Sequence, residues 1–197
     1  MSAGLRVLLC ALGLALAPAA FGQQPETPNG LLLVAKPGMA DPNFARTVVL
    51  VTQAEDASTV GVILNRPTRA RLSQLLPEEP ASANYRDPVY AGGPVMRQAL
   101  IALFRADEKP SAPAFHVLKG VYLTMHPENL KTLLAEPGRS YRVYAGFSGW
   151  APRQLESEFV RNDWYVLPAD AETVFRADTG GLWDELVRKA TRPKPQT

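Results

Sequence analysis

A serine flanked by glycines is the stretch of this sequence that could hold a catalytic nucleophile. It lies in residues 144–150, which read YAGFSGW and follow an alternating, strand-like run. In hydrolases the nucleophile elbow is G-x-S-x-G, so its second glycine stands two residues after the serine. Here Gly149 follows Ser148 directly, and Trp150 takes the place of the second glycine. The spacing favours a strand-to-helix turn over a nucleophilic Ser148, and we predict no catalytic residue.

The histidines give no support for catalysis or for metal binding. His116 and His126 carry no spacing that marks a general base, and His126 precedes Pro127, which fits the start of a helix. No H-E-x-x-H or C-x-x-C motif is present, so we predict neither a metal site nor a cofactor. A small-molecule hydrolase remains the alternative, and it requires Ser148 within hydrogen-bond reach of one of the two histidines.

Two turn-like motifs could contact an anionic ligand. Gly92-Gly93-Pro94 could present backbone amides to a phosphate, but it lacks the lysine and hydroxyl of a P-loop, and its proline removes a donor. A structural turn is therefore the favoured interpretation. In Asn65-Arg66-Pro67, the arginine either binds an anion or pairs with a carboxylate such as Asp41, and we favour the ion pair.

The elements that must position these residues are buried strands with short helices between them. Apolar or alternating runs predict strands at 31–35, 47–52, 59–64, 100–104, 121–124, 141–147 and 164–167. Helices are predicted at 72–76, 127–135, from 151 with Leu155 and Phe159 on one side, at 169–175 and at 182–189. Because the helices interrupt the strands irregularly, the fold class is α+β rather than a regular βαβ repeat.

Composition indicates one globular domain and excludes few classes of function. The chain has 197 residues, of which 46% are hydrophobic and 20% charged. A formal net charge of +2 is too balanced to predict a nucleic-acid partner. Cys10 is the only cysteine, so a chain that loses its first residues has no disulfide and no cysteine nucleophile.

The first residues have the pattern of a secretory signal peptide at 1–22. Arg6 supplies a basic start, 7–17 is an apolar run, and small residues precede an expected cleavage between Gly22 and Gln23. The run is too short to span a bilayer, so no transmembrane anchor is expected after cleavage. An uncleaved N-terminal anchor is the competing interpretation. The predicted location is therefore the periplasm or the exterior.

Several motifs, taken in order, resemble the YqgE/AlgH family of bacterial proteins. They are GLLLVA at 30–35, MADPNFARTVVL at 39–50, GVILNRP at 61–67, GGPV at 92–95, GFSGW at 146–150, QLE at 154–156, Trp164 with Pro168-Ala169, and Leu182-Trp183. The resemblance implies one α+β domain whose bifurcated, mostly antiparallel sheet folds as a pseudo-barrel with flanking helices. It implies no activity, because the family has no agreed biochemical function and only one branch is linked to the regulation of alginate synthesis.

The expected organisation is a domain at 30–190, preceded by a polar spacer at 23–29 and followed by a disordered tail at 191–197. Two features depart from the family pattern. Relatives commonly carry histidines where this chain has Gln53 and Phe104, so a shared histidine site is not expected. Relatives are also usually cytoplasmic, whereas the leader predicts export of this chain. An exported protein could not act in transcription, so a transcription-related regulator is the alternative only if the leader is not cleaved.

We therefore predict a non-enzymatic binding or regulatory protein of the bacterial envelope, with a protein or small-molecule partner. The motif residues outside the core form the candidate ligand-binding surface: Asp41, Asn43, Arg46, Asn65, Arg66, Gly92, Gly93 and Trp150. Such residues either contact a ligand or hold turns of the fold, and the structural role is the favoured interpretation. Side chains that lie on opposite faces would argue against a shared pocket.

Overall fold

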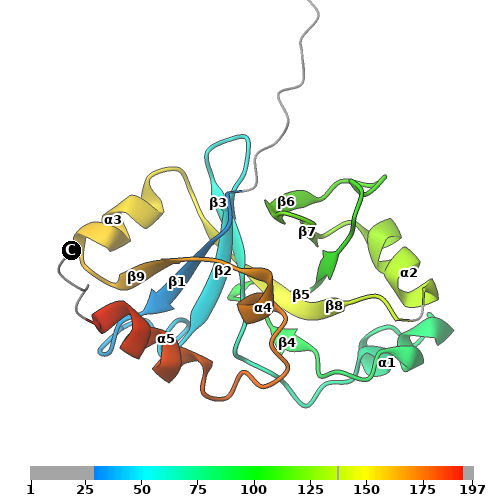
Figure 1. Ribbon diagram of the computed structural model, residues 1–197. Coiled ribbons are helices and arrows are strands. Elements are labelled where there is room, and N and C mark those ends of the chain that lie inside the picture. Colours follow the sequence, from blue (N-terminus) through cyan, green and yellow to red (C-terminus); the bar gives the residue numbers. More distant parts are fainter. Residues whose placement is uncertain (1–28, 137, 193–197) are drawn as a thin grey trace, which may run out of the picture.

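The computed structural model describes residues 29–136 and 138–192, and the predicted leader lies outside this part of the chain (Figure 1). The described strands are β1 (Leu31–Ala35), β2 (Val48–Gln53), β3 (Thr59–Ile63), β4 (Tyr90–Ala91), β5 (Val95–Arg105), β6 (Phe115–Leu118), β7 (Val121–Thr124), β8 (Tyr141–Trp150) and β9 (Trp164–Pro168). The helices are α1 (Leu72–Leu75), the 3-10 helix η1 (Pro80–Asn84), α2 (Pro127–Ala135), α3 (Gln154–Val160), α4 (Ala171–Val174) and α5 (Leu182–Thr191).

One sheet organises the domain, with the strand order β6-β7-β5-β8-β3-β2-β1-β9. All pairings on this path are antiparallel, and β4 joins β8 in parallel. The prediction of a single α+β domain with a mostly antiparallel sheet is confirmed. The sheet forks along β8, because residues 141–145 and Phe147 pair with β5 whereas residues 148–150 pair with β3.

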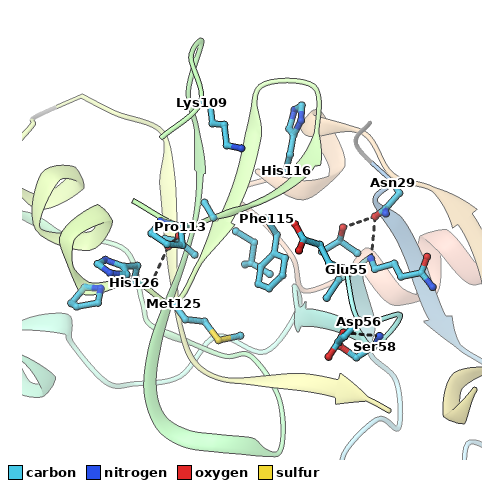
Figure 2. A pocket seen from close by; sticks show the side chains of 17 residues that line it. Asn29, Glu55, Asp56, Ser58, Lys109, Pro113, Phe115, His116, Met125 and His126 are labelled. Carbon is cyan, nitrogen blue, oxygen red and sulfur yellow. Dashed lines mark hydrogen bonds between the residues drawn. The ribbon is translucent and has the colours of Figure 1, made fainter. Parts of the chain in front are cut away.

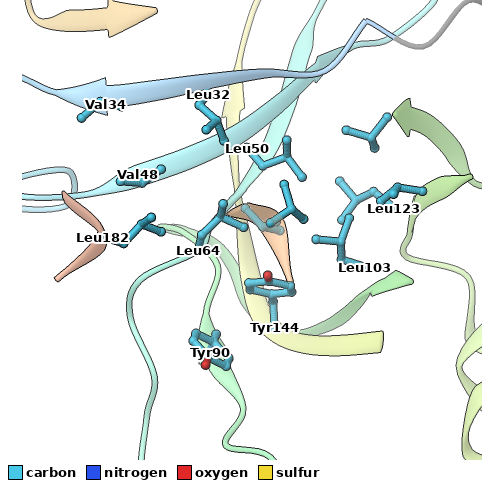
Figure 3. Close-up of a cluster of buried hydrophobic side chains, with 14 of the residues drawn as sticks. Leu32, Val34, Val48, Leu50, Leu64, Tyr90, Leu103, Leu123, Tyr144 and Leu182 are labelled. Carbon is cyan, nitrogen blue, oxygen red and sulfur yellow. The ribbon is translucent and has the colours of Figure 1, made fainter. Parts of the chain in front are cut away.

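The sheet is not closed into a barrel, which corrects the pseudo-barrel part of the prediction. The strands on the two sides of β8 form two arms, one of β6, β7 and β5 and the other of β3, β2, β1 and β9. The arms face each other across a shared core, to which Leu32, Leu50, Leu103, Leu123 and Tyr144 contribute (Figure 3). A backbone hydrogen bond from the amide of Gly30 to the carbonyl of Val117, 2.8 Å long, links the start of β1 to β6. The arms therefore touch at that point without continuing the strand ladder.

The uninterrupted apolar run of β2 is explained by burial on both faces. Val48 and Leu50 point into the core between the arms, whereas Val49 and Val51 pack into a second cluster with Trp150. Successive side chains of a strand point to opposite faces, so a strand covered on both sides loses its alternation of apolar and polar residues. The strands predicted at 47–52 and 59–64 pair as the antiparallel hairpin β2–β3, with Val51 opposite Gly61.

The predicted turn at 148–149 is wrong, because β8 continues through Ser148 to Trp150. The bend lies inside the strand at Gly146, whose φ is +71° and whose Cβ, if present, would lie 2.8 Å from the carbonyl oxygen of Gly93. Only glycine adopts this conformation without strain. Gly146 therefore serves a bent strand, not a strand-to-helix elbow.

Several element ends also differ from the prediction. The helix expected from 151 begins at Gln154; Leu155 packs against the tryptophan cluster, but Phe159 is 41% exposed. Helix α5 runs to Thr191, into the segment expected as tail. Helix α2 occupies Pro127–Ala135 as predicted. Within the described residues, no helix is both long enough and apolar enough to cross a membrane.

Candidate functional site

The glycine pair of the GGPV motif fills the fork of the sheet. The amide of Gly92 donates to the carbonyl of Ala145 at 2.9 Å, and its carbonyl accepts from the amide of Ile63 at 2.9 Å, so Gly92 bridges β8 and β3. A Cβ on Gly93 would lie 2.2 Å from the carbonyl carbon of Phe147. This contact is far below van der Waals separation, so the predicted structural role of the pair is supported by the packing.

Ser148 lies beside this fork and is fully buried. Its Oγ donates to the carbonyl oxygen of Gly92 at 3.1 Å. A serine nucleophile needs a base as the acceptor of its proton and access to a substrate. The hydroxyl of Ser148 is instead directed at a backbone carbonyl inside the core.

Arg66 holds the loop that contains the DPNFAR motif. Its guanidinium donates to the carbonyls of Pro42, Asn43 and Ala45. Asp41 accepts instead from the amide of Asn43 at 2.8 Å, which closes the start of the loop. The favoured ion pair between Arg66 and Asp41 is therefore replaced by hydrogen bonds to the backbone. Burial lowers the pKa of Arg66, and the nearby Asp41 carboxylate partly offsets that effect.

Asn65 and Arg46 fix the other end of the same loop. The side chain of Asn65 accepts from the amide of Val48 at 2.9 Å and donates to the carbonyl of Arg46 at 3.0 Å. The Arg46 guanidinium lies 4.1 Å from the ring centre of Trp183 and pairs with Asp184 at 3.0 Å. These contacts attach the loop to β2 and α5.

Trp150 belongs to the core on the opposite face of the β1–β2–β3 arm from the shared core. It is 2% exposed, and its ring centre lies 5.5 Å from that of Phe44. The Glu158 carboxylate accepts from Nε1 of Trp150 at 3.1 Å and from Nε1 of Trp164 at 2.8 Å. Both indole N–H groups are thus satisfied by one carboxylate from α3.

The candidate residues divide into those that hold the fold and those that also reach a cavity. Asn43, Arg66 and Gly93 line a cavity of about 300 Å³ at the fork. The others that line it are Ile63, Ala91, Pro94, Arg97 and Ala145. The other five candidates do not line it, so the eight residues do not form one pocket; these five are Asp41, Arg46, Asn65, Gly92 and Trp150. Arg97 was missed because its exposed position in β5 carries no motif.

A larger cleft of about 1060 Å³ lies between the β2–β3 turn and the β6–β7 hairpin (Figure 2). The residues that line it are Asn29, Thr52, Gln53, Ala54, Glu55, Asp56, Ser58, Lys109, Pro113, Ala114, Phe115, His116, Leu123, Thr124, Met125, His126 and Pro127. Phe115, Leu123 and Met125 give it an apolar surface, and Met125 is 37% exposed. Sequence reasoning missed the cleft as a site.

Titratable side chains lie on both walls of the cleft. Glu55 and Asp56 lie on the β2–β3 turn, across from Lys109 and His126 (Figure 2). The hydroxyl and amide of Ser58 donate to Asp56 at 2.6 and 3.0 Å, and these hydrogen bonds lower the pKa of that carboxyl.

Buried hydrogen bonds support the opposite wall. Thr124 Oγ1 donates to the carbonyl of Pro113 at 2.8 Å and accepts from the side chain of Asn129 at 2.9 Å. His126 caps α2, because its Nδ1 accepts from the amide of Glu128 at 3.3 Å. The wall formed by β7 and the start of α2 is thus held by side chains that do not depend on a ligand.

The chemistry that this arrangement supports is non-covalent binding. Across the described ranges, no group of three or more His, Cys, Asp or Glu side chains is placed to hold a metal ion. The cleft provides an apolar surface with a few polar groups at its edge, and the fork cavity provides two arginines. Neither contains Ser148.

The comparisons with known proteins agree on one family. A family profile described as AlgH-like matches residues 32–194. A UPF0301 protein from Thermobifida fusca is 38% identical over 170 residues, covering 82% of this chain and 86% of the relative. One from Myxococcus xanthus is 34% identical over 160 residues, covering 80% and 87%.

Solved structures show the same fold. The solution structure of AlgH from Pseudomonas aeruginosa superposes with a TM-score of 0.68 at 25% identity, covering 83% of this chain and 89% of the other. The crystal structure of protein DIP2367 from Corynebacterium diphtheriae gives a TM-score of 0.65 at 26% identity, covering 88% and 91%.

Proposed function

This chain belongs to the AlgH-like family, and on that premise we propose that it is a non-enzymatic binding protein of the bacterial envelope whose ligand occupies the cleft between the β2–β3 turn and the β6–β7 hairpin. The observation that carries the proposal is the cleft itself. Its volume of about 1060 Å³ is at the upper end of the sizes that hold small molecules, and its surface is apolar with a polar edge.

The cleft fits an amphipathic small molecule. Its apolar body packs on Phe115 and Met125, where burial of apolar surface supplies most of the binding free energy. A cationic or hydrogen-bonding group on the ligand faces Glu55 and Asp56. The hydrogen bonds from Ser58 that lower the pKa of Asp56 stabilise its charged form, which suits a cationic group on the ligand.

The hydrolase alternative is not favoured by any observation in the cleft. His116 and His126 both line it, but Ser148 does not. Ser148 is buried and donates its proton to a backbone carbonyl. Non-covalent binding therefore explains the cleft without requiring a nucleophile and an oriented base, which a hydrolase would need.

The envelope location rests on the sequence of residues 1–22. Cell fractionation followed by N-terminal sequencing tests it. We expect the protein outside the cytoplasm with Gln23 as its first residue. A cytoplasmic protein that retains residues 1–22 would overturn export and restore the transcription-related alternative, while leaving the cleft proposal to its own test.

A charge placed on the apolar surface tests the cleft. The neutral fluorescent probe N-phenyl-1-naphthylamine is titrated into the wild type and into Met125→Glu. We expect saturable fluorescence enhancement in the wild type and at least about tenfold weaker binding in the variant, because the carboxylate must be desolvated. Met125 is partly exposed, so the fold should tolerate the change.

Met96→Glu is the matched control. Met96 is 65% exposed and is not among the residues that line the cleft. We expect its probe affinity to stay within about twofold of the wild type, since it adds the same charge elsewhere. Equal affinity in Met125→Glu and the wild type would show that the probe binds outside the cleft. Absence of probe binding to the wild type would also count against the proposal.

A further inference from the structure

We propose that the fork cavity is a second binding site, which takes the oxyanion group of a small ligand, either a carboxylate or a phosphate. This site lies at the fork of the sheet and is lined by different residues from the cleft. The inference does not depend on the proposed function of the cleft.

Two arginines supply the positive charge. Arg66 and Arg97 both line the cavity, and they come from the segment after β3 and from β5. A guanidinium presents N–H groups in a planar fork that matches two oxygens of a carboxylate or phosphate. Two arginines that line one small cavity attract an anion more strongly than a single surface arginine, because both positive charges act on the same ligand.

Arg66 is held in place and still has donors to spare. Three hydrogen bonds to backbone carbonyls fix its guanidinium, which has five N–H groups in total. The carbonyls are neutral acceptors, so the positive charge has no carboxylate in direct contact among the bonds that hold it. An incoming anion would offset the cost of burying that charge. The arginine is thus preorganised for an oxyanion.

Arg97 has fewer hydrogen bonds to the protein than Arg66. Its Nη2 donates to Oδ1 of Asn43 at 3.4 Å, a long and exposed hydrogen bond. Asn43 is itself fixed because its backbone accepts from Arg66 and donates to Asp41. Asn43 therefore directs Arg97 toward the cavity, and a stronger anionic acceptor can replace it.

The rest of the cavity limits the ligand. Ile63, Ala91, Pro94 and Ala145 give an apolar surface beside the arginines, within about 300 Å³. The site thus fits a small molecule with one oxyanion and a short apolar part, not a long chain. Asp41, which lies near Arg66, disfavours a second negative group on the ligand.

Isothermal titration calorimetry with sodium butyrate and with sodium phosphate tests the site and separates the two sources of the oxyanion. We expect saturable binding of at least one anion to the wild type, weakened by added sodium chloride. Butyrate binding alone would assign a carboxylate ligand, and phosphate binding alone a phosphate ligand. Absence of saturable binding for both would overturn the proposal.

Arg97→Gln is the test variant, because Arg97 is exposed and does not support the loop as Arg66 does. We expect affinity to fall at least about tenfold. Arg86→Gln removes the same charge from an exposed residue that does not line the cavity, and should change affinity by less than about twofold. Equal losses in both variants would indicate a general charge effect and contradict the site. Met125→Glu should keep anion binding, so failure of either proposal can be recognised separately.

Discussion

Trp150→Ala is expected to lower the free energy of unfolding by about 3–5 kcal/mol, as truncation of a buried tryptophan usually does. The indole is 2% exposed and packs against Phe44 and Trp164, so alanine would leave a cavity that its neighbours cannot fill. The change also removes one of the two indole donors to the Glu158 carboxylate. Urea unfolding followed by circular dichroism measures the loss.

Phe159→Ala is the control for that variant. Phe159 lies on α3, next to Glu158, but it is 41% exposed and is not part of the tryptophan cluster. We expect it to cost less than about 1 kcal/mol. If Trp150→Ala were equally mild, its ring would not close the core, and its motif position would have to be explained by ligand contact.

Gly93→Ala is expected to cost about 3 kcal/mol or more, at the upper end of the range for overpacked sites. The added Cβ would meet the carbonyl of Phe147 at 2.2 Å and the amide of Ser148 at 2.4 Å. Both contacts are with backbone, so β8 itself must move and the fork must open. The midpoint and slope of urea unfolding report the effect.

Gly181→Ala makes the same chemical change where a Cβ meets nothing within 4 Å. This glycine precedes α5, so a cost of up to about 1 kcal/mol is expected from the helix cap alone. A Gly93→Ala protein as stable as Gly181→Ala would show that the GGPV motif is not required by the fork, and would favour a ligand contact at that position.

Short-range patterns predicted the buried strands and the starts of α1, α2 and α5. The run at 47–52 is continuous because both faces of β2 are covered, and Pro127 starts α2 with His126 as its cap. The family motifs added the bifurcated sheet. The sequence patterns predicted the wrong backbone structure at Ser148. Glycines on both sides of a serine indicate a turn when the strand that pairs with them is unknown.

The two proposed binding sites depend on contacts between distant segments, which sequence patterns do not reveal. Glu55 in the β2–β3 turn and Met125, which directly follows β7, come from opposite arms of the sheet, and only the fork brings them to one cleft. Arg97 joins Asn43 for the same reason. The sequence predicts an ion pair between Arg66 and Asp41. In the structure the guanidinium instead donates to backbone carbonyls of the loop that contains Asn43.

Amide chemical-shift mapping during titration with N-phenyl-1-naphthylamine tests the central claim most directly, because it locates the bound probe on the folded chain. The cleft account predicts saturable shifts concentrated at Ser58, Phe115 and Met125, with little change along α5. Shifts concentrated on α5 or β9, with the cleft amides unchanged, would contradict the assignment of the cleft as the ligand site.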